Sequence, residues 1–159
     1  MESSFIIKHQ DRDIVKPVKS AKIRFRFLDG TWRVGLELRT FDEFDFDNPE
    51  NWNEDDYITI HLQDYPIGTR DPRQSEHVEI RVPKGYDLEE GVHWTNLYFG
   101  EHFETNANLI KLTRDLDGSY LVNWTCTSDD VDYYDSHAKD NAIEIRGKAV
   151  VVEQIQYPW

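Results

Sequence analysis

Residues 127–140, TSDDVDYYDSHAKD, gather side chains that could bind an ion or a basic group. Five aspartates stand here, with Tyr133 and Tyr134 among them. Several carboxylate oxygens converging on one point would suit Ca²⁺, although the glycine and the final glutamate of an EF-hand loop are missing. The alternatives are a patch that contacts a protein or a sugar, and a polar crossover whose aspartates cap backbone N–H groups.

Residues 41–56, FDEFDFDNPENWNEDD, form a second acidic stretch, with eight Asp or Glu and no Lys or Arg. A central strand would bury too many of these carboxylates, so we predict a long loop. Its aromatic residues could anchor a partner protein while the carboxylates attract a basic one. The simpler alternative is a solvated loop that Phe44 or Trp52 pins to the core.

None of the six histidines has the HxH or HExxH spacing that would bring two imidazoles to one metal ion. His61 and His77 fall on the polar faces of alternating strands, so we expect them to face solvent. Glu101 and His102, with His93 nearby, come closest to an acid–base pair. They lack an adjacent nucleophile or metal-ligand pattern.

The rest of the sequence argues against an enzyme. It has no phosphate-binding glycine loop, no G-x-S-x-G and no Rossmann fingerprint, and we expect no cofactor. The single cysteine, Cys126, excludes an internal disulfide and follows Trp124 toward the predicted core. The opening residues MESSFIIKHQ do not resemble a signal peptide, and no apolar run approaches membrane-spanning length. We therefore expect a cytoplasmic protein.

The net charge of −13 constrains the partners. Residues 1–40 have nine Lys or Arg against five Asp or Glu, whereas residues 41–159 have nine against 26. Nucleic-acid phosphates and anionic membrane surfaces should repel such a chain, so we expect neither as a partner. Attraction to a basic protein is one explanation of the charge, and simple solubility is the other.

Residues 21–39, AKIRFRFLDGTWRVGLELR, predict the clearest structural element, a β-hairpin. Apolar and polar residues alternate on both sides of Asp29-Gly30, a dipeptide suited to a type I′ turn. This turn would pair Phe27 with Trp32, Phe25 with Val34, Ile23 with Leu36 and Ala21 with Leu38, all on one apolar face. A one-residue slip would expose every one of them.

The second face of this hairpin is basic. It carries Lys22, Arg24 and Arg26 on one strand, and Arg33 lies directly across from Arg26. A like-charged cross-strand pair is destabilising unless an acidic group covers it. We expect the ridge to be solvated or paired with an acidic loop of the same protein.

Residues 108–127 predict a second hairpin. A three-residue loop, Leu116-Asp117-Gly118, sets Leu112 opposite Val122 and Ile110 opposite Trp124, with Gly118 in the left-handed region. Other loop lengths would set polar residues against that apolar face.

Further strands are predicted at residues 4–8, 57–63, 78–82, 94–99 and 142–156, the last as one long strand or as two, with Gly147 as the natural bulge or break. Residues 65–75 read as a loop, and no segment shows sustained helical periodicity. About eight short strands with turns between them predict one all-β domain over residues 1–159. We favour an antiparallel β-sandwich with long acidic loops and little or no helix, with a closed β-barrel as the alternative.

These properties favour a non-enzymatic binding protein that sequesters or inhibits a basic partner. A small, acidic, cysteine-poor chain without catalytic motifs resembles, in general character, the bacterial immunity proteins that neutralise nuclease toxins. The residues expected to contact the partner are Asp129, Asp130, Asp132, Tyr133 and Tyr134 in one segment and Asp47, Trp52 and Asp55 in the other. The alternatives are a β-sandwich module that binds carbohydrate, with or without calcium, and a structural interaction domain.

Overall fold

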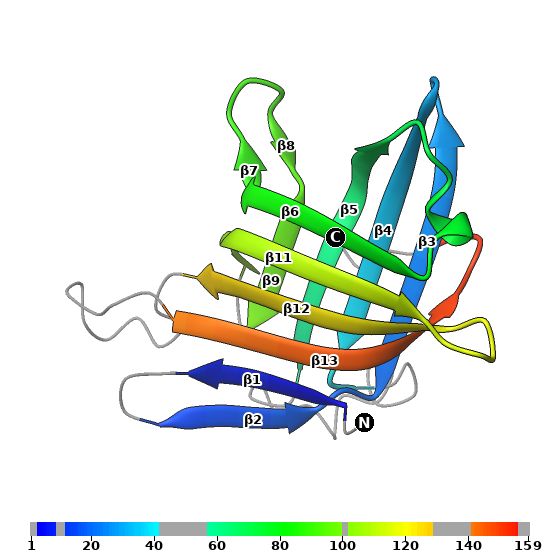
Figure 1. The fold of residues 1–159 in the computed structure, drawn as a ribbon. Helices are drawn as coiled ribbons and strands as arrows, with labels where there is room; N and C mark the ends of the chain where they lie inside the picture. The colour runs from blue at the N-terminus through cyan, green and yellow to red at the C-terminus, as the bar shows by residue number, and fades with distance from the viewer. Residues whose placement is uncertain (1–2, 9–11, 42–56, 100–101, 129–140, 156–159) are drawn as a thin grey trace.

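A computed structural model describes residues 3–8, 12–41, 57–99, 102–128 and 141–155 (Figure 1). These residues form an almost entirely β structure, which confirms the predicted all-β class. The one helical element among them is the short 3-10 turn η3 (Pro72–Gln74). No helix in the described part of the chain is long and apolar enough to cross a membrane.

Most strands belong to one curled sheet. Its members are β1 (Ser4–Lys8), β2 (Asp13–Pro17), β3 (Ser20–Leu28), β4 (Thr31–Arg39), β5 (Ile58–Gly68), β6 (His77–Lys84), β9 (Thr95–Phe99), β10 (His102–Phe103), β11 (Thr105–Arg114), β12 (Tyr120–Ser128) and β13 (Asn141–Val151). The main order is β10-β9-β5-β4-β3-β13-β12-β11-β6, and β1 and β2 are added beside β13. A separate small hairpin joins β7 (Tyr86–Asp87) and β8 (Val92–His93).

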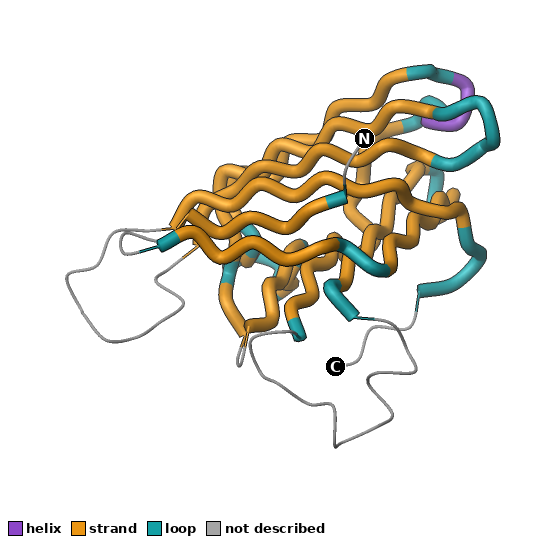
Figure 2. The backbone as a smooth tube through the Cα atoms, turned by 90° about the horizontal axis from the view of Figure 1, so that it is seen from below, coloured by secondary structure: helices purple, strands orange, loops and turns teal. Residues whose placement is uncertain are grey.

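The sheet curls so that its two halves face each other (Figures 1 and 2). Strands β6, β11, β12, β13, β1 and β2 form one half, and β3, β4, β5, β9 and β10 form the other. Strand β13 joins them, because Val150 and Val151 pair with Lys22 and Ile23 of β3. That contact is parallel, whereas the other pairings are antiparallel, so the expected purely antiparallel pattern has one exception.

Of the two alternatives for the last predicted strand, the structure shows one long strand, since β13 runs without a bulge or break past Gly147, which pairs with Val122. The glycine instead permits a close approach between the two halves. A Cβ atom at this position would lie 3.0 Å from Cδ2 of Leu38 on β4. Side-chain size, more than backbone freedom, therefore explains the glycine.

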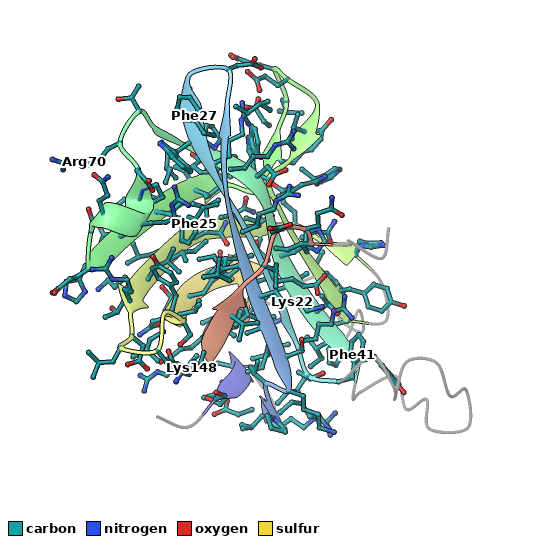
Figure 3. The ribbon with its side chains drawn as sticks, turned by 90° about the vertical axis from the view of Figure 1, so that its right-hand side faces the viewer. Lys22, Phe25, Phe27, Phe41, Arg70 and Lys148 are labelled. Atoms are coloured by element: carbon teal, nitrogen blue, oxygen red, sulfur yellow. The ribbon has the colours of Figure 1, made fainter. Side chains whose placement is uncertain are left out.

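The first hairpin has the predicted turn and register. Asp29 and Gly30 both have positive φ, at 53° and 78°, and Phe27, Phe25 and Ile23 pair as expected. Its apolar face is buried over most of its length but not at the tip, where Phe27 is 56% exposed (Figure 3). There the face extends beyond the opposite half of the sheet, and Arg73 stacks 4.8 Å from the Trp32 ring.

The second hairpin is also confirmed. Leu112 pairs with Val122 and Ile110 with Trp124, and Gly118 has φ 86° in a three-residue loop. The predicted strand that follows the acidic stretch is longer than expected, because β5 includes residues 65–68 of the stretch read as a loop. The rest of that stretch lies outside the strands, as predicted. Strands β2, β7, β8 and β10 were not predicted from the sequence.

A buried hydrogen-bond network connects the two halves. At a bulge in β11 the Asn108 side chain donates to Val82 O (3.0 Å) and Thr105 O (2.8 Å) and accepts from the Trp124 indole N–H (2.9 Å). The Thr95 hydroxyl of β9, in the other half, donates to Thr105 O at 3.1 Å. Oγ1 of Thr105 lies 2.6 Å from Oγ1 of Thr95 and 3.0 Å from Oδ1 of Asn108. These polar groups fix the spacing of the halves.

Candidate functional site

The residues expected to contact a partner lie outside the described residues. They are Asp47, Trp52 and Asp55 in residues 42–56, and Asp129, Asp130, Asp132, Tyr133 and Tyr134 in residues 129–140. The residues on either side of each segment contact each other. Ser128 pairs with Asn141 beside the second segment. Beside the first, Thr40 and Ile58 exchange hydrogen bonds, and the Phe41 and Tyr57 rings lie 4.9 Å apart.

The charge of the chain is divided between these segments and the described strands. Residues 42–56 contain eight Asp or Glu and no Lys or Arg, and residues 129–140 contain five Asp and one Lys. Together they account for −12 of the net −13. The described residues contain 17 Lys or Arg and 15 Asp or Glu, and so are slightly basic. The acidity of the protein is therefore concentrated on two connections between strands.

The described residues include a groove of about 420 Å³. It lies between the β7–β8 hairpin, the end of β6 and the outer part of β5, at one open end of the curled sheet (Figure 1). Three aromatic residues, Tyr65, Tyr86 and Trp94, line it, together with Pro83 and the exposed Leu88. Aromatic walls with a few polar groups are typical of ligand and peptide sites.

Short-range contacts hold the aromatic walls in place. The Tyr65 and Trp94 rings meet edge to face at 5.3 Å, and the Tyr65 hydroxyl donates to Arg81 O at 3.3 Å. The backbone N–H of Trp94 donates to the backbone O of Gly85 at 2.7 Å, and this bond connects the residue before β9 to the residue after β6. The Tyr86 ring packs 4.5 Å from the ring of His93. The groove is thus a preformed feature of the fold.

The groove was not identified from the sequence. Tyr65, Tyr86 and Trp94 are far apart in the chain, and only the pairing of β5 with β9 and of β6 with β11 brings them together. A signal was present, because each aromatic residue stands within three positions of a proline or glycine that marks a strand end. That signal says that the rings lie near turns, but not that the turns are neighbours.

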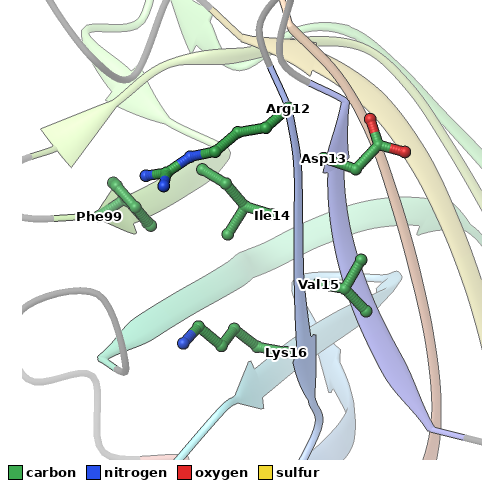
Figure 4. Close-up of a pocket in the computed structure, with 6 residues that line it drawn as sticks. All are labelled: Arg12, Asp13, Ile14, Val15, Lys16 and Phe99. Carbon is green, nitrogen blue, oxygen red and sulfur yellow. The ribbon is translucent and has the colours of Figure 1, made fainter.

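A smaller pocket of about 230 Å³ lies between β2 and the end of β9 (Figure 4). Ile14 and Lys16 of β2, and Arg12 just before it, point to the side of Phe99, because alternate side chains of an extended segment share one face. Asp13 and Val15 point to the opposite side. The arrangement presents two cationic groups around an apolar floor.

Asp64 supplies an acidic partner to the basic ridge of the first hairpin, for which the sequence predicted either solvation or pairing with an acidic loop. Its carboxylate pairs with the guanidinium of Arg24 and lies 4.0 Å from that of Arg26. Its backbone carbonyl accepts from Arg33 at 3.1 Å. Asp64 has φ 45° at a bulge in β5, and this irregularity turns the carboxylate toward the ridge. The acidic partner is therefore a strand residue and not a loop.

We expect Asp64→Asn to destabilise the protein by about 2 kcal/mol, because Arg24 is largely buried and would lose its carboxylate. Asparagine tolerates the left-handed backbone, so the change removes the charge alone. Urea unfolding gives the free energy. Glu79→Gln, which breaks an exposed pair with Arg81, is the control and should cost less than about 1 kcal/mol. Equal losses in the two variants would contradict the role assigned to Asp64.

His61 is buried, contrary to the expectation that it faces solvent. It is 3% exposed on β5 and pairs with Glu37 of β4. Burial, with a smaller contribution from the charge of His102, lowers the pKa of His61 to about 4. Glu37 is also buried, and its carboxylate lies 2.6 Å from Nε of Arg39. The polar face of the β4–β5 pair is therefore a buried ionisable surface. His77 is exposed, as expected.

The three residues that came closest to an acid–base pair are only partly described. His93 and His102 lie toward opposite ends of β9, since His102 pairs with Tyr98 while His93 precedes the strand. Glu101 lies outside the described residues. No three His, Cys, Asp or Glu side chains gather into a metal site in the part of the chain that the structure describes. Cys126 is buried as predicted, and burial raises the pKa of its thiol.

Comparisons of the chain with protein-family models, with curated proteins and with solved structures gave no match.

Proposed function

We propose that the protein is a non-enzymatic, cytoplasmic binding protein that sequesters or inhibits a basic protein partner, as an immunity protein does with a toxin. The separation of charge carries this proposal. Two connections between strands hold −12 of the net −13, whereas the described strands and turns are slightly basic. Acidic groups concentrated in this way accelerate the approach of a basic protein and favour it over other partners.

The contacts in this proposal come from both acidic segments. Asp47, Trp52 and Asp55 act in the first, and Asp129, Asp130, Asp132, Tyr133 and Tyr134 act in the second. The tyrosines and the tryptophan supply the apolar anchors that dominate most interfaces, and the carboxylates meet cationic side chains. The pairing of Ser128 with Asn141 and the tilted contact of the Phe41 and Tyr57 rings support this role, because they attach each segment to paired strands.

We also propose that the curled sheet is a β-sandwich, with a closed barrel as the alternative. Strands β10 and β6 end the main order, and in the described residues they do not pair with each other. The apolar core lies between two facing halves, as a sandwich requires.

The first step of the test uses the tagged full chain to capture proteins from the source cells at low and at high salt. The second step measures the association rate of the chain with the captured protein. We expect one stoichiometric basic protein, released by salt. Its association rate should fall at least about tenfold in D129N/D130N/D132N. The matched control is D29N/E76Q/E153Q, which removes the same charge from exposed framework residues and should nearly retain the rate.

Two outcomes would contradict the proposal. One is an association rate that does not change with ionic strength, because steering by exposed charge must be screened by salt. The other is an equal loss of rate in the segment variant and in the framework control. That result would mean that net charge matters and that the position of the acidic segments does not.

A further inference from the structure

The rim of the aromatic groove is acidic, although the described residues as a whole are slightly basic. Asp87 and Glu89 line the groove. Glu104 lies beside it, and its carboxylate accepts from the Tyr86 N–H at 3.3 Å. The one cation among the lining residues is Lys84. Three carboxylates against one ammonium give this end of the molecule a local negative charge.

The acidic rim has a defined geometry. Oδ1 of Asp87 accepts from the N–H groups of Glu89 and Glu90 at 2.9 and 3.1 Å, which fixes its carboxylate at the start of the β7–β8 turn. Tyr86 directly precedes Asp87 on β7, and Leu88 at the tip is 85% exposed. Carboxylates, aromatic rings and an exposed apolar side chain therefore meet within one short hairpin.

We propose that this groove receives an arginine side chain of a basic protein partner. The guanidinium group is planar, stacks on aromatic faces and pairs with carboxylates, whereas its aliphatic stem packs against apolar surface. Tyr65, Tyr86 and Trp94 provide the rings, and Asp87 and Glu89 provide the counter-charge. The inference rests on the proposed function for the identity of the partner. It assigns to the described strands a second contact, separate from the acidic segments.

The groove can be tested without the partner. The probe is N-acetyl-arginine methylamide, titrated into the full chain and followed by the NMR signal of the Trp94 indole N–H, assigned with Trp94→Phe. The neutral isostere N-acetyl-citrulline methylamide is the matched ligand control. We expect arginine to shift the Trp94 signal at concentrations where citrulline does not, because the two differ in charge and hardly in shape.

Three variants show whether arginine binding depends on the carboxylates of the groove or on acidic residues elsewhere in the protein. D87N/E89Q should weaken arginine binding about tenfold, by loss of the counter-charge. E76Q/E79Q removes two exposed acidic residues outside the groove lining and should leave it nearly unchanged. D129N/D130N/D132N should also retain the arginine shift. Failure of partner capture with retained arginine binding would thus overturn the proposed function alone.

Equal shifts with arginine and citrulline, or no shift with either, would overturn the inference. So would a Trp94 response to glucose or cellobiose in the absence of a response to arginine, which would assign the groove to carbohydrate. If the captured partner binds Y86A/W94A as tightly as it binds the unmodified chain, the groove is not part of the interface and the acidic segments act alone.

Discussion

Replacing Asn108 with alanine should cost about 3 kcal/mol of the free energy of unfolding, the largest loss that we expect from one polar side chain of this fold. The side chain is 2% exposed and satisfies two carbonyls and the Trp124 indole N–H. Its removal leaves that indole donor without a partner in the core and opens a cavity. Thermal unfolding should shift down by roughly 6–12 °C, and urea unfolding measures the free energy directly.

Two further variants show whether the hydrogen bonds or the volume are responsible. Asn108→Asp keeps the size but sets a carboxylate oxygen against Val82 O and Thr105 O, so it should destabilise at least as much as the alanine variant. Asn123→Ala, at a partly exposed position on β12, should change stability by less than about 0.5 kcal/mol. A loss near 1 kcal/mol or less for Asn108→Ala would show that the network does not hold the halves together.

The two hairpins were predictable because local chemistry determines their register. Asp29-Gly30 fits one turn type, and the facing of Leu112 with Val122 selects one loop length for the other hairpin. Each choice depends on residues less than about ten positions from the turn. Strand identity and core-facing residues such as Cys126 follow from the same alternation.

The predictions that failed concern features that depend on contacts between residues distant in sequence. Alternation placed His61 on a polar face but could not say whether that face is covered, and in the structure it is buried. Pro66 indicated a loop, yet β5 continues through it, and a bulge lets Asp64 reach the basic ridge. The inward turn of Asn108 depends on the bulge in β11, where Ala107 has φ 51°. Such irregularities leave no periodic signal.

The same limit applies to the site. The acidic segments are visible in the sequence because charge can be counted along the chain. The groove is not, because its walls come from β5, from the β6–β7 connection and from the start of β9. The part of the proposed interface that would attract a partner could thus be predicted from the sequence. The part that would receive a specific side chain could be proposed only once the fold was known.

The protein should lose about 3 kcal/mol of stability between pH 6.5 and pH 4 because of His61 alone. The folded state holds this imidazole neutral with a pKa of about 4, while the unfolded chain protonates it near the ordinary value of 6.5. Above pH 6.5 both states are neutral and the contribution is complete. As the pH falls, the unfolded chain binds the proton first, so stability declines until the folded pKa is reached.

His61→Gln separates this effect from the titration of carboxylates. Glutamine does not ionise, so the unfolding free energy of H61Q should fall less steeply than that of the unmodified chain between pH 6.5 and 4. His77→Gln, at an exposed histidine, is the matched control, and the decline assigned to His61 should persist in it. NMR titration of the His61 ring protons gives the folded pKa directly. A midpoint near 6.5 would mean that the imidazole accepts its proton without unfolding, and that the polar face of β4 and β5 is open to water.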